Sequence, residues 1–309
     1  MNTDPFSVTA TSRGIYHPLL GTNVEIRIIA AGPTSAHELA KAGEQAALVE
    51  MERLQSVFSV FDPASELSRW RAGGDVEPSG ELVEVLEAAQ CWWAASGGAF
   101  HPATAHLRQR WLRAEAEQEL PSPDELRGLA GDLGRLPFAV NDGTATRIGD
   151  CSGLDLNAIA KGYIVDRGVA AAAACEGVID VLVNAGGDLR HVGTDPLRVG
   201  VEDPRSPGGV PIRVVELGEA AMATSGPVHR GFRIEAQWFG HVLDPRTGWP
   251  VAGRPSTTVL APDAMSADAL ATVVGVLDWA DAVRVILGVP GAAAITVDPE
   301  GEERSFGQW

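Results

Sequence analysis

The sequence predicts an α+β fold in which mixed or antiparallel sheets are flanked by helices. Alternating apolar residues predict strands at 212–217, 232–244 and 256–261, and these segments follow one another with no helical pattern between them. Near the start of the chain, the segment from Ile15 to Ile29 reads as two strands that turn at Leu20-Gly21-Thr22. Strands that follow strands directly are typical of antiparallel pairing, whereas a doubly wound sheet alternates its strands with helices.

Most of the segments outside these predicted strands show the pattern of helices. One helix is expected to follow the start signal Pro33-Thr34-Ser35 and to end near Phe58. A second helix is expected between the start signal Pro78-Ser79 and the stop signal Gly97-Gly98.

The middle of the chain is less regular. The segment 110–150 is charged and contains proline, which predicts an excursion over the surface with a short helix from Pro123 to Leu129. Residues 153–200 then read as loop, helix, strand, glycine-rich turn and strand, and a further helix is expected from Ser266. We expect one domain over residues 1–309 and assign no boundary between subdomains.

Composition excludes several classes of function. Of the 309 residues, 45% are hydrophobic and 21% are charged, and no apolar run approaches the ~20 residues of a membrane span. The formal net charge of −17 argues against a nucleic-acid surface and against attraction to anionic lipid. An anionic substrate would therefore need a local metal ion, lysine or set of backbone amides.

Two features bear on the cellular compartment. The cysteines Cys91, Cys151 and Cys175 are odd in number and far apart, so we expect buried free thiols. The first fourteen residues lack the basic segment, apolar core and cleavage site of a secretory signal, so a cytoplasmic location is expected.

The pair Asp268 and Thr272 offers a candidate metal site. With Ser266 as the expected N-cap, residues four apart share one helical face near the start of the helix. A carboxylate and a hydroxyl are hard oxygen ligands suited to Mg²⁺. The same spacing occurs on solvated helix faces, so the pair alone does not establish a site.

Two further motifs could contact phosphate groups. The turn Asn184-Ala185-Gly186-Gly187-Asp188 allows close backbone approach, but it also fits an ordinary hairpin and lacks the spacing of a dinucleotide or P-loop motif. Asp155 and Lys161 flank the segment 157–160, where the lysine is either a phosphate contact or a solvated side chain.

Two later segments carry hydroxyl and imidazole groups. Thr224-Ser225-Gly226 follows a predicted strand, as phosphate-contacting loops often do. His241 lies at the end of a predicted strand, where it could be a base, a phosphate donor or the partner of Asp244, and the residues alone favour the last.

Taken in order, eight motifs between Leu19 and Thr272 resemble those of the ApbE-like FAD:protein FMN transferases: LLGT, FDPASELSRW, GAFHP, LDLNAIAKGY, NAGGD, ATSG, HVLDPRTGWP and APDAMSADALAT. The resemblance implies an ApbE-like fold that holds FAD in a cleft between two subdomains. It also implies a Mg²⁺-dependent reaction that moves FMN from FAD to a threonine or serine hydroxyl of a target protein and releases AMP. Some members of that family instead hydrolyse FAD to FMN and AMP.

The resemblance implies roles for individual residues. The side chains of Asp268 and Thr272 and the carbonyl oxygen of Ala158 would bind Mg²⁺, with Mn²⁺ as the alternative metal. His241 would assist deprotonation of the acceptor hydroxyl. The positions that would contact FAD or line its cleft are Leu20, Phe61, Ala99, Phe100, His101, Asp155, Lys161, Thr224, Ser225 and Val242.

The sequence departs from the family pattern at several positions. Leu20 replaces a common methionine and Phe61 a usual tyrosine, and both changes preserve packing against flat rings. His101 replaces the aspartate of GAFD, so a group that can donate a hydrogen bond stands where a carboxylate only accepts. The tyrosine expected after ATSG is absent, and Arg230 in this loop is a phosphate contact, an acceptor contact or a surface charge.

Three functions are therefore weighed. The first is the FMN transferase, whose partners are FAD and a cytoplasmic flavoprotein acceptor, with no nucleic acid and no membrane span. An FAD diphosphatase would share the metal and nucleotide groups but use water as the nucleophile. A catalytically weak FAD-binding protein is suggested by His101 and the altered ATSG loop, whereas the set Asp268, Thr272, Lys161 and His241 argues against it.

Overall fold

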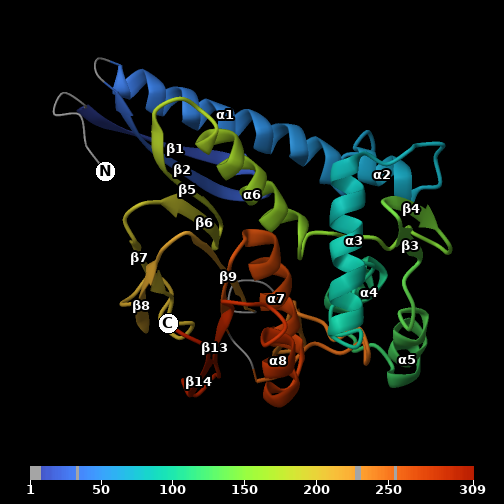
Figure 1. The fold of residues 1–309 in the computed structure, drawn as a ribbon. Helices are drawn as coiled ribbons and strands as arrows, with labels where there is room; N and C mark the ends of the chain where they lie inside the picture. Colours follow the sequence, from blue (N-terminus) through green and yellow to red (C-terminus); the bar gives the residue numbers. More distant parts are fainter. Residues whose placement is uncertain (1–7, 33–34, 227–230, 254–255) are drawn as a thin grey trace.

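The computed structural model describes residues 8–32, 35–226, 231–253 and 256–309. Its centre is an eight-stranded sheet with the order β1-β2-β5-β6-β9-β12-β13-β14, in which every neighbouring pair is antiparallel (Figure 1). Strands of this sheet are β1 Val8–Leu19, β2 Thr22–Gly32, β5 Val178–Ala185, β6 Asp188–Gly193, β9 Ala220–Ser225, β12 Ser256–Ala261, β13 Ala293–Val297 and β14 Glu303–Phe306.

Three two-stranded sheets and eight helices complete the part of the chain that the structure describes. The hairpins are β3 Phe138–Asn141 with β4 Thr144–Arg147, β7 Leu197–Val201 with β8 Arg213–Leu217, and β10 Gly231–Ile234 with β11 Gln237–Gly240. The helices are α1 Ala36–Phe58, α2 Glu66–Arg71, α3 Gly80–Ala95, α4 Ala105–Glu117, α5 Pro123–Asp132, α6 Ala160–Ala173, α7 Ala264–Val276 and α8 Trp279–Ile286.

The pleat of the large sheet divides its apolar residues between two cores. Val181 and Val183 of β5 belong to the main core together with residues of α1, α6 and α7, whereas Leu182 faces the other side. The same alternation separates Val259 from Leu260 on β12. Helices α1, α6 and α7 therefore cover one face of the sheet, and the β7–β8 hairpin packs against the other (Figure 1).

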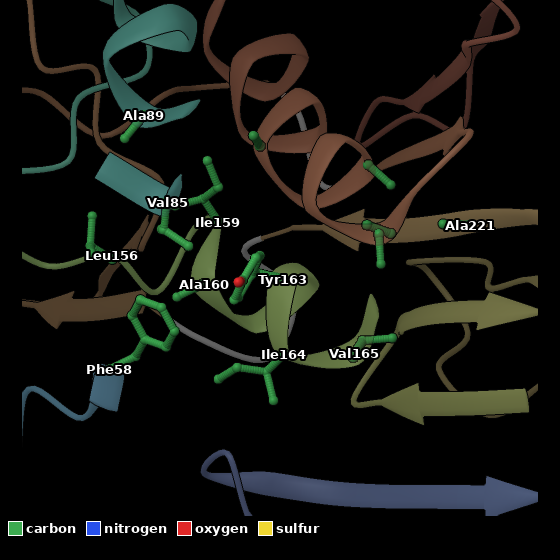
Figure 2. Packing of buried hydrophobic residues seen from close by; sticks show 14 of the residues in the cluster. Phe58, Val85, Ala89, Leu156, Ile159, Ala160, Tyr163, Ile164, Val165 and Ala221 are labelled. Atoms are coloured by element: carbon green, nitrogen blue, oxygen red, sulfur yellow. The ribbon is translucent and has the colours of Figure 1, made fainter. Parts of the chain in front are cut away.

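Helix α6 lies at the centre of the main core. Figure 2 shows Ile159, Ala160, Tyr163 and Ile164 among buried residues of neighbouring elements. The ring of Tyr163 lies 5.7 Å from that of Phe58 in an edge-on arrangement, and burial of such apolar area stabilises the packing of α6 on α1. The first turn of α6 is thus held rigidly.

The first hairpin confirms the predicted turn. Strands β1 and β2 pair antiparallel from Val8 with Gly32 to Leu19 with Thr22. Leu20 in the turn has a φ of 53°, and its N–H donates to Gln55 Oε1 at 2.7 Å. A bond from α1 therefore holds this candidate site residue in a left-handed conformation that non-glycine residues seldom adopt.

The prediction of an irregular segment at 110–150 was wrong at its start. Helix α4 covers residues 110–117, and Trp111 is fully buried against Phe232, Phe239 and Trp249. Except for the buried Arg110, the charged residues of α4 are exposed or partly exposed, so composition concealed a helix whose apolar side meets the β10–β11 hairpin. The short helix predicted at Pro123 is confirmed as α5.

Three other predictions needed correction. The strand expected at 232–244 is the β10–β11 hairpin followed by a loop. Helix α7 begins at Ala264, because the carboxylate of Asp263, not the hydroxyl of Ser266, accepts the capping N–H bond. Cys151 is buried, but Cys91 is exposed and Cys175 is partly exposed.

Other predictions of helices and strands are confirmed. Helix α3 follows Ser79, and the segment 153–200 has the expected loop, helix, strand and turn, although two strands, β6 and β7, follow the turn where one was expected. The helix expected from the signal Pro33-Thr34-Ser35 begins at Ala36, although Pro33 and Thr34 lie outside the described residues. None of the helices in the described ranges is both long enough and apolar enough to cross a membrane.

Candidate active site

The first turns of α6 and α7 meet where the sequence predicts a metal site. The backbone N–H of Gly162 donates to Oδ2 of Asp268 at 3.2 Å, although the two residues are 106 positions apart. Lys161 precedes Gly162 and forms an ion pair with Asp188 at the start of β6. Residues of three predicted motifs, LDLNAIAKGY, NAGGD and APDAMSADALAT, therefore converge on one cluster.

Glycine at position 162 makes this meeting possible. A Cβ atom at residue 162 would lie 2.2 Å from the carbonyl oxygen of Ala264 and 2.8 Å from Cα of Met265. Both atoms belong to the backbone of α7, so no side-chain rotation could make room. Helix α6 approaches α7 closely enough for a backbone-to-carboxylate bond only because residue 162 has no side chain.

The electrostatics of the cluster favour a cation. Asp268 is 8% exposed, and burial raises the pKa of its carboxyl group, while the charge of Lys161 and the N–H of Gly162 act in the opposite direction. Asp188 is 2% exposed and shares Lys161. When ionised, the two carboxylates exceed the one ammonium group by one negative charge, which a divalent cation would offset.

Ala158, whose carbonyl is the third metal ligand that the resemblance implies, lies four residues before Gly162. In a helix that began one residue earlier, the N–H of Gly162 would bond the carbonyl of Ala158. That N–H instead donates to Asp268, and no backbone N–H bonds the Ala158 carbonyl in the parts of the chain that the structure describes. The role of the Ala158 carbonyl as a metal ligand stays a prediction.

Thr272 completes the set of hard oxygen atoms. It follows Asp268 by four residues on α7, is half-buried, and shares that helical face. A carboxylate, a hydroxyl and a carbonyl fit Mg²⁺, which keeps several water or substrate oxygens. Among the described residues, no group of three or more His, Cys, Asp or Glu side chains is arranged to hold a metal, so a site rich in such ligands is not part of this region.

Backbone contacts assemble a second corner around Arg71, between two loops that carry positions expected to contact FAD. The guanidinium of Arg71 donates to the carbonyl oxygens of Val60 and Leu154 at 2.9 Å each. These bonds join the loop that carries Phe61 to the loop that carries Asp155. Phe61 is 86% exposed and borders an open cavity of about 520 Å³ together with Arg71. An exposed aromatic ring beside a cavity can stack on a flat ligand.

The residues Ala99, Phe100 and His101 are fixed beneath this corner. All three are at most 6% exposed. The backbone N–H of Asp155 donates to the carbonyl of Pro102 at 2.7 Å, which ties this segment to the Asp155 loop. Their direct contact with FAD stays a prediction, while their support of the Asp155 loop follows from the geometry.

Both ring nitrogens of His101 face backbone groups. Nδ1 accepts from the N–H of Ala103 at 3.1 Å, and Nε2 lies 3.4 Å from the carbonyl of Arg135. The Nε2–H tautomer satisfies both contacts. Burial lowers the pKa of His101 to about 4, so the ring is neutral at pH 7. His101 thus stabilises the turn at residues 101–103 through its ring, and it is uncharged at a position where the family pattern has a carboxylate.

His101 is expected to make stability depend on pH. The unfolded chain takes up a proton at His101 below its ordinary pKa near 6.5, whereas the folded chain does so only near pH 4. The free energy of unfolding should therefore be full above pH 6.5 and should fall by about 3 kcal/mol as the pH drops to 4. Urea unfolding of wild type and His101→Asn across this range tests the expectation, because Asn keeps the acceptor for Ala103 but does not titrate. Parallel pH profiles of the two proteins would contradict it.

The pleat separates the two hydroxyls predicted at the end of β9. Ser225 shares the face of Ala221 and Ala223, which belong to the core beneath α7. Thr224 shares the opposite face, and its hydroxyl lies 3.0 Å from that of Thr258. Only Ser225 is therefore placed on the α7 side of the sheet.

The loop after β11 is anchored to α4. The indole N–H of Trp111 donates to the carbonyl of Gly248 at 2.9 Å, and the N–H of Val251 donates to the carbonyl of Val242. His241 and Val242 are half-buried at the start of this loop. The two oxygens of Asp244 bind Arg246 at 2.9 Å, so this carboxylate has an arginine partner, which sequence reasoning did not anticipate.

Sequence reasoning also missed Gly162, Arg71 and Asp166 as determinants of the site. Asp166 accepts from the N–H groups of Ala264 and Met265. Its spacing of four residues from Gly162 would have placed both on one face of α6. For Arg71 the sequence held no signal, since its partners are backbone carbonyls remote in the chain.

The family model of ApbE, described as the ApbE family, matches residues 20–296. The chain belongs to the ApbE family. This membership confirms the resemblance that the eight motifs predict. An FAD:protein FMN transferase of Treponema pallidum is 27% identical to this chain over 93% of its length and 84% of the relative's. The enzyme class predicted for this chain, a transferase, is the class of that relative.

Solved structures agree with the fold. The ApbE protein from Thermotoga maritima superposes with a TM-score of 0.80, is 29% identical, and matches 96% of each chain. The flavinyl transferase ApbE from Pseudomonas stutzeri, in its apo form, gives a TM-score of 0.77 at 23% identity over 98% of this chain and 96% of its own, a likeness that bears on the fold alone. The predicted α+β fold class is thereby confirmed.

Proposed function

We propose that this ApbE-family chain is a Mg²⁺-dependent FAD:protein FMN transferase. The observation that supports the proposal is the bond from the N–H of Gly162 to Asp268, beside the charge of Lys161, where the first turns of α6 and α7 meet. This cluster offers hard oxygen atoms beside one ammonium group in a chain whose net charge is otherwise −17. Such a site suits a pyrophosphate that arrives with a divalent cation.

The residues present fit that ion. Asp268 and Thr272 would hold Mg²⁺ through their side chains and Ala158 through its carbonyl, with Mn²⁺ as the alternative. A bound Mg²⁺ would supply charge neutralisation and Lewis-acid polarisation at the FAD pyrophosphate. Lys161 would then serve as a point charge for a phosphate oxygen, in exchange for part of its contact with Asp188.

The nucleotide would lie along the two corners of the site. Asp155 and the Phe61 ring would contact FAD at the corner held by Arg71, where the cavity of about 520 Å³ opens. The remaining positions assigned to FAD by the resemblance are Leu20, Ala99, Phe100, His101, Lys161, Thr224, Ser225 and Val242. Of the last three, Ser225 has the stronger support from the pleat, because it faces α7.

The acceptor is proposed to be a threonine or serine hydroxyl of a flavoprotein. His241 would accept the hydroxyl proton, the oxygen would form a bond to the FMN phosphorus, and the bond to the AMP phosphate oxygen would break. AMP leaves with the electron pair of that bond. Water in place of the hydroxyl would give free FMN and AMP, which is the diphosphatase alternative.

One incubation separates the transferase from its alternatives. Purified protein is mixed with FAD and Mg²⁺, with an acceptor protein that carries the target threonine or with its Thr→Ala form, and AMP, free FMN and covalent flavin are measured by chromatography. We expect AMP and covalent flavin in equal amounts with the threonine acceptor alone. AMP with free FMN in every tube would establish a diphosphatase instead, and intact bound FAD would indicate a binding protein.

A further inference from the structure

Two carboxylates of different origin hold the start of α7. Asp263 caps its own helix, because Oδ1 accepts from the N–H of Ser266 at 2.7 Å and Oδ2 from the Ser266 hydroxyl at 3.0 Å. Asp166 belongs to α6. Its Oδ1 accepts from the N–H of Ala264 at 2.8 Å and its Oδ2 from the N–H of Met265 at 2.9 Å. One helix therefore binds the first N–H groups of the other.

The bonds between α6 and α7 run in both directions. Asp166 follows Gly162 by one helical turn on the same face of α6. At one end of this face the carboxylate of α6 accepts from α7, and at the other end the N–H of Gly162 donates to Asp268 of α7. At Gly162 the backbones of the two helices lie so close that a Cβ atom would fall 2.2 Å from the carbonyl oxygen of Ala264. Three contacts of this kind fix both the spacing and the relative rotation of two helices.

A cation from the sheet supports Asp166. The Nη1 atom of Arg190 on β6 lies 3.0 Å from Oδ1 of Asp166 and 2.9 Å from the carbonyl of Pro262, just before α7. Burial raises the pKa of Asp166, whereas the two N–H groups and Arg190 favour its charged form. The side chain of Asp166 is 18% exposed, so these partners replace most of its water.

Capping alone does not account for Asp166. The N-cap position of α7 is already occupied by Asp263, which satisfies the third N–H of the helix. The two N–H groups left over would ordinarily bond water at an exposed helix end. Here these N–H groups donate to Asp166 of α6, which lies on the same face of α6 as Gly162, the donor to Asp268.

We propose that Asp166 is a positioning residue that sets α7 against α6 and thereby places the Asp268 carboxylate beside the Ala158 carbonyl for a divalent cation. The placement of the helices stands on the contacts alone, and the benefit to the cation rests on the proposed function. Both oxygens of Asp166 accept N–H groups of α7, so Asp166 would act on the ion through Gly162 and Asp268.

The first test needs no metal. Hydrogen exchange of the Gly162 amide is followed in wild type, Asp166→Asn and Asp263→Asn, without added cation. Asparagine at 166 keeps the shape but can accept from only one of the two N–H groups. We expect exchange of the Gly162 amide to rise about 10-fold in Asp166→Asn, since a bond to a charged group is lost at the tether. Asp263→Asn should match wild type, because Asn remains a good N-cap.

The second test measures Mn²⁺ and Mg²⁺ binding by calorimetry in the same three proteins. We expect Asp166→Asn to weaken the binding about 10- to 100-fold, as is typical when the support of a ligand is removed. The matched loss of one negative charge in Asp263→Asn should have a far smaller effect. Equal amide exchange in the three proteins would overturn the inference, whatever the metal results. Failure of wild type to bind either ion would count against the proposed metal site, while the exchange result would still decide the role of Asp166.

A milder variant guards against failure to fold. Arg190→Met removes the cation that supports Asp166 but leaves both N–H bonds to the carboxylate in place. We expect a smaller increase of Gly162 exchange, about 3-fold, in the same direction. Exchange identical to wild type in both Arg190→Met and a folded Asp166→Asn protein would refute the tether.

Discussion

Replacement of Asp268 by asparagine is expected to lower metal-dependent turnover about 10³-fold while the protein stays folded, since a bound cation is worth several kcal/mol to the charged transition state. The amide oxygen of Asn can still accept from the N–H of Gly162, so the contact between α6 and α7 survives. Lys161 keeps Asp188 as its partner, so no buried charge is left alone. What disappears is the negative charge that would bind the ion. Turnover of FAD and Mg²⁺ affinity, measured beside thermal unfolding, check this result.

Two companion variants sharpen the test. Asp268→Ala should cost about 1–3 kcal/mol of stability in addition, because the N–H of Gly162 then lies buried without an acceptor. This cost is expected because Asp268 is only 8% exposed, so water could not replace the lost acceptor. Thr272→Val should give only a partial loss of turnover. Full activity of Asp268→Asn would contradict the proposal that Asp268 binds the metal ion.

The sequence predicted those parts of the fold that follow from local pattern. The alternation of β2, the apolar run of β5 and the start signals of α3 and α5 all depend on neighbouring residues, and these elements were predicted correctly. Helix α4 was missed because its core is assembled with the distant β10–β11 hairpin. Its charged residues dominate the sequence, and the three aromatic contacts of Trp111 cannot be read from residues 110–117 alone.

The site residues show the same difference between features that local spacing predicts and features that depend on tertiary packing. Asp268 and Thr272 are linked by helical spacing, so their shared face was predictable. The approach of Gly162 to Asp268 depends on tertiary packing between segments 106 positions apart. The pairing of Arg246 with Asp244 is local, since the two residues are two positions apart. Residue spacing could not predict that Lys161 and Asp268 belong to one site. The order of the motifs predicted it, through the resemblance to the family.

Replacement of Gly162 by alanine is expected to have the largest effect on stability of any single methyl group added to α6. The new Cβ would meet the carbonyl carbon of Ala264 at 2.5 Å and its oxygen at 2.2 Å, so α7 would have to move away. Overpacking against backbone costs about 3 kcal/mol, which exceeds the gain of about 1 kcal/mol from helix propensity. The same movement would break the bonds of Asp166 and Asp268, so metal affinity should fall with stability.

Gly275→Ala on α7 is the matched control. Its Cβ would lie 3.7 Å from the hydroxyl oxygen of Thr257, an ordinary contact, so the substitution should be neutral or should stabilise by up to about 1 kcal/mol. Urea unfolding and Mg²⁺ binding of both variants distinguish a general helix effect from the approach of α6 to α7. A Gly162→Ala protein as stable as Gly275→Ala, with unchanged metal affinity, would mean that the two helices have room to separate without loss. Asp268→Asn removes the negative charge of the site, whereas Gly162→Ala displaces α7 and so moves the carboxylate. Metal affinity should therefore fall in both variants, but only Gly162→Ala should also lower the free energy of unfolding.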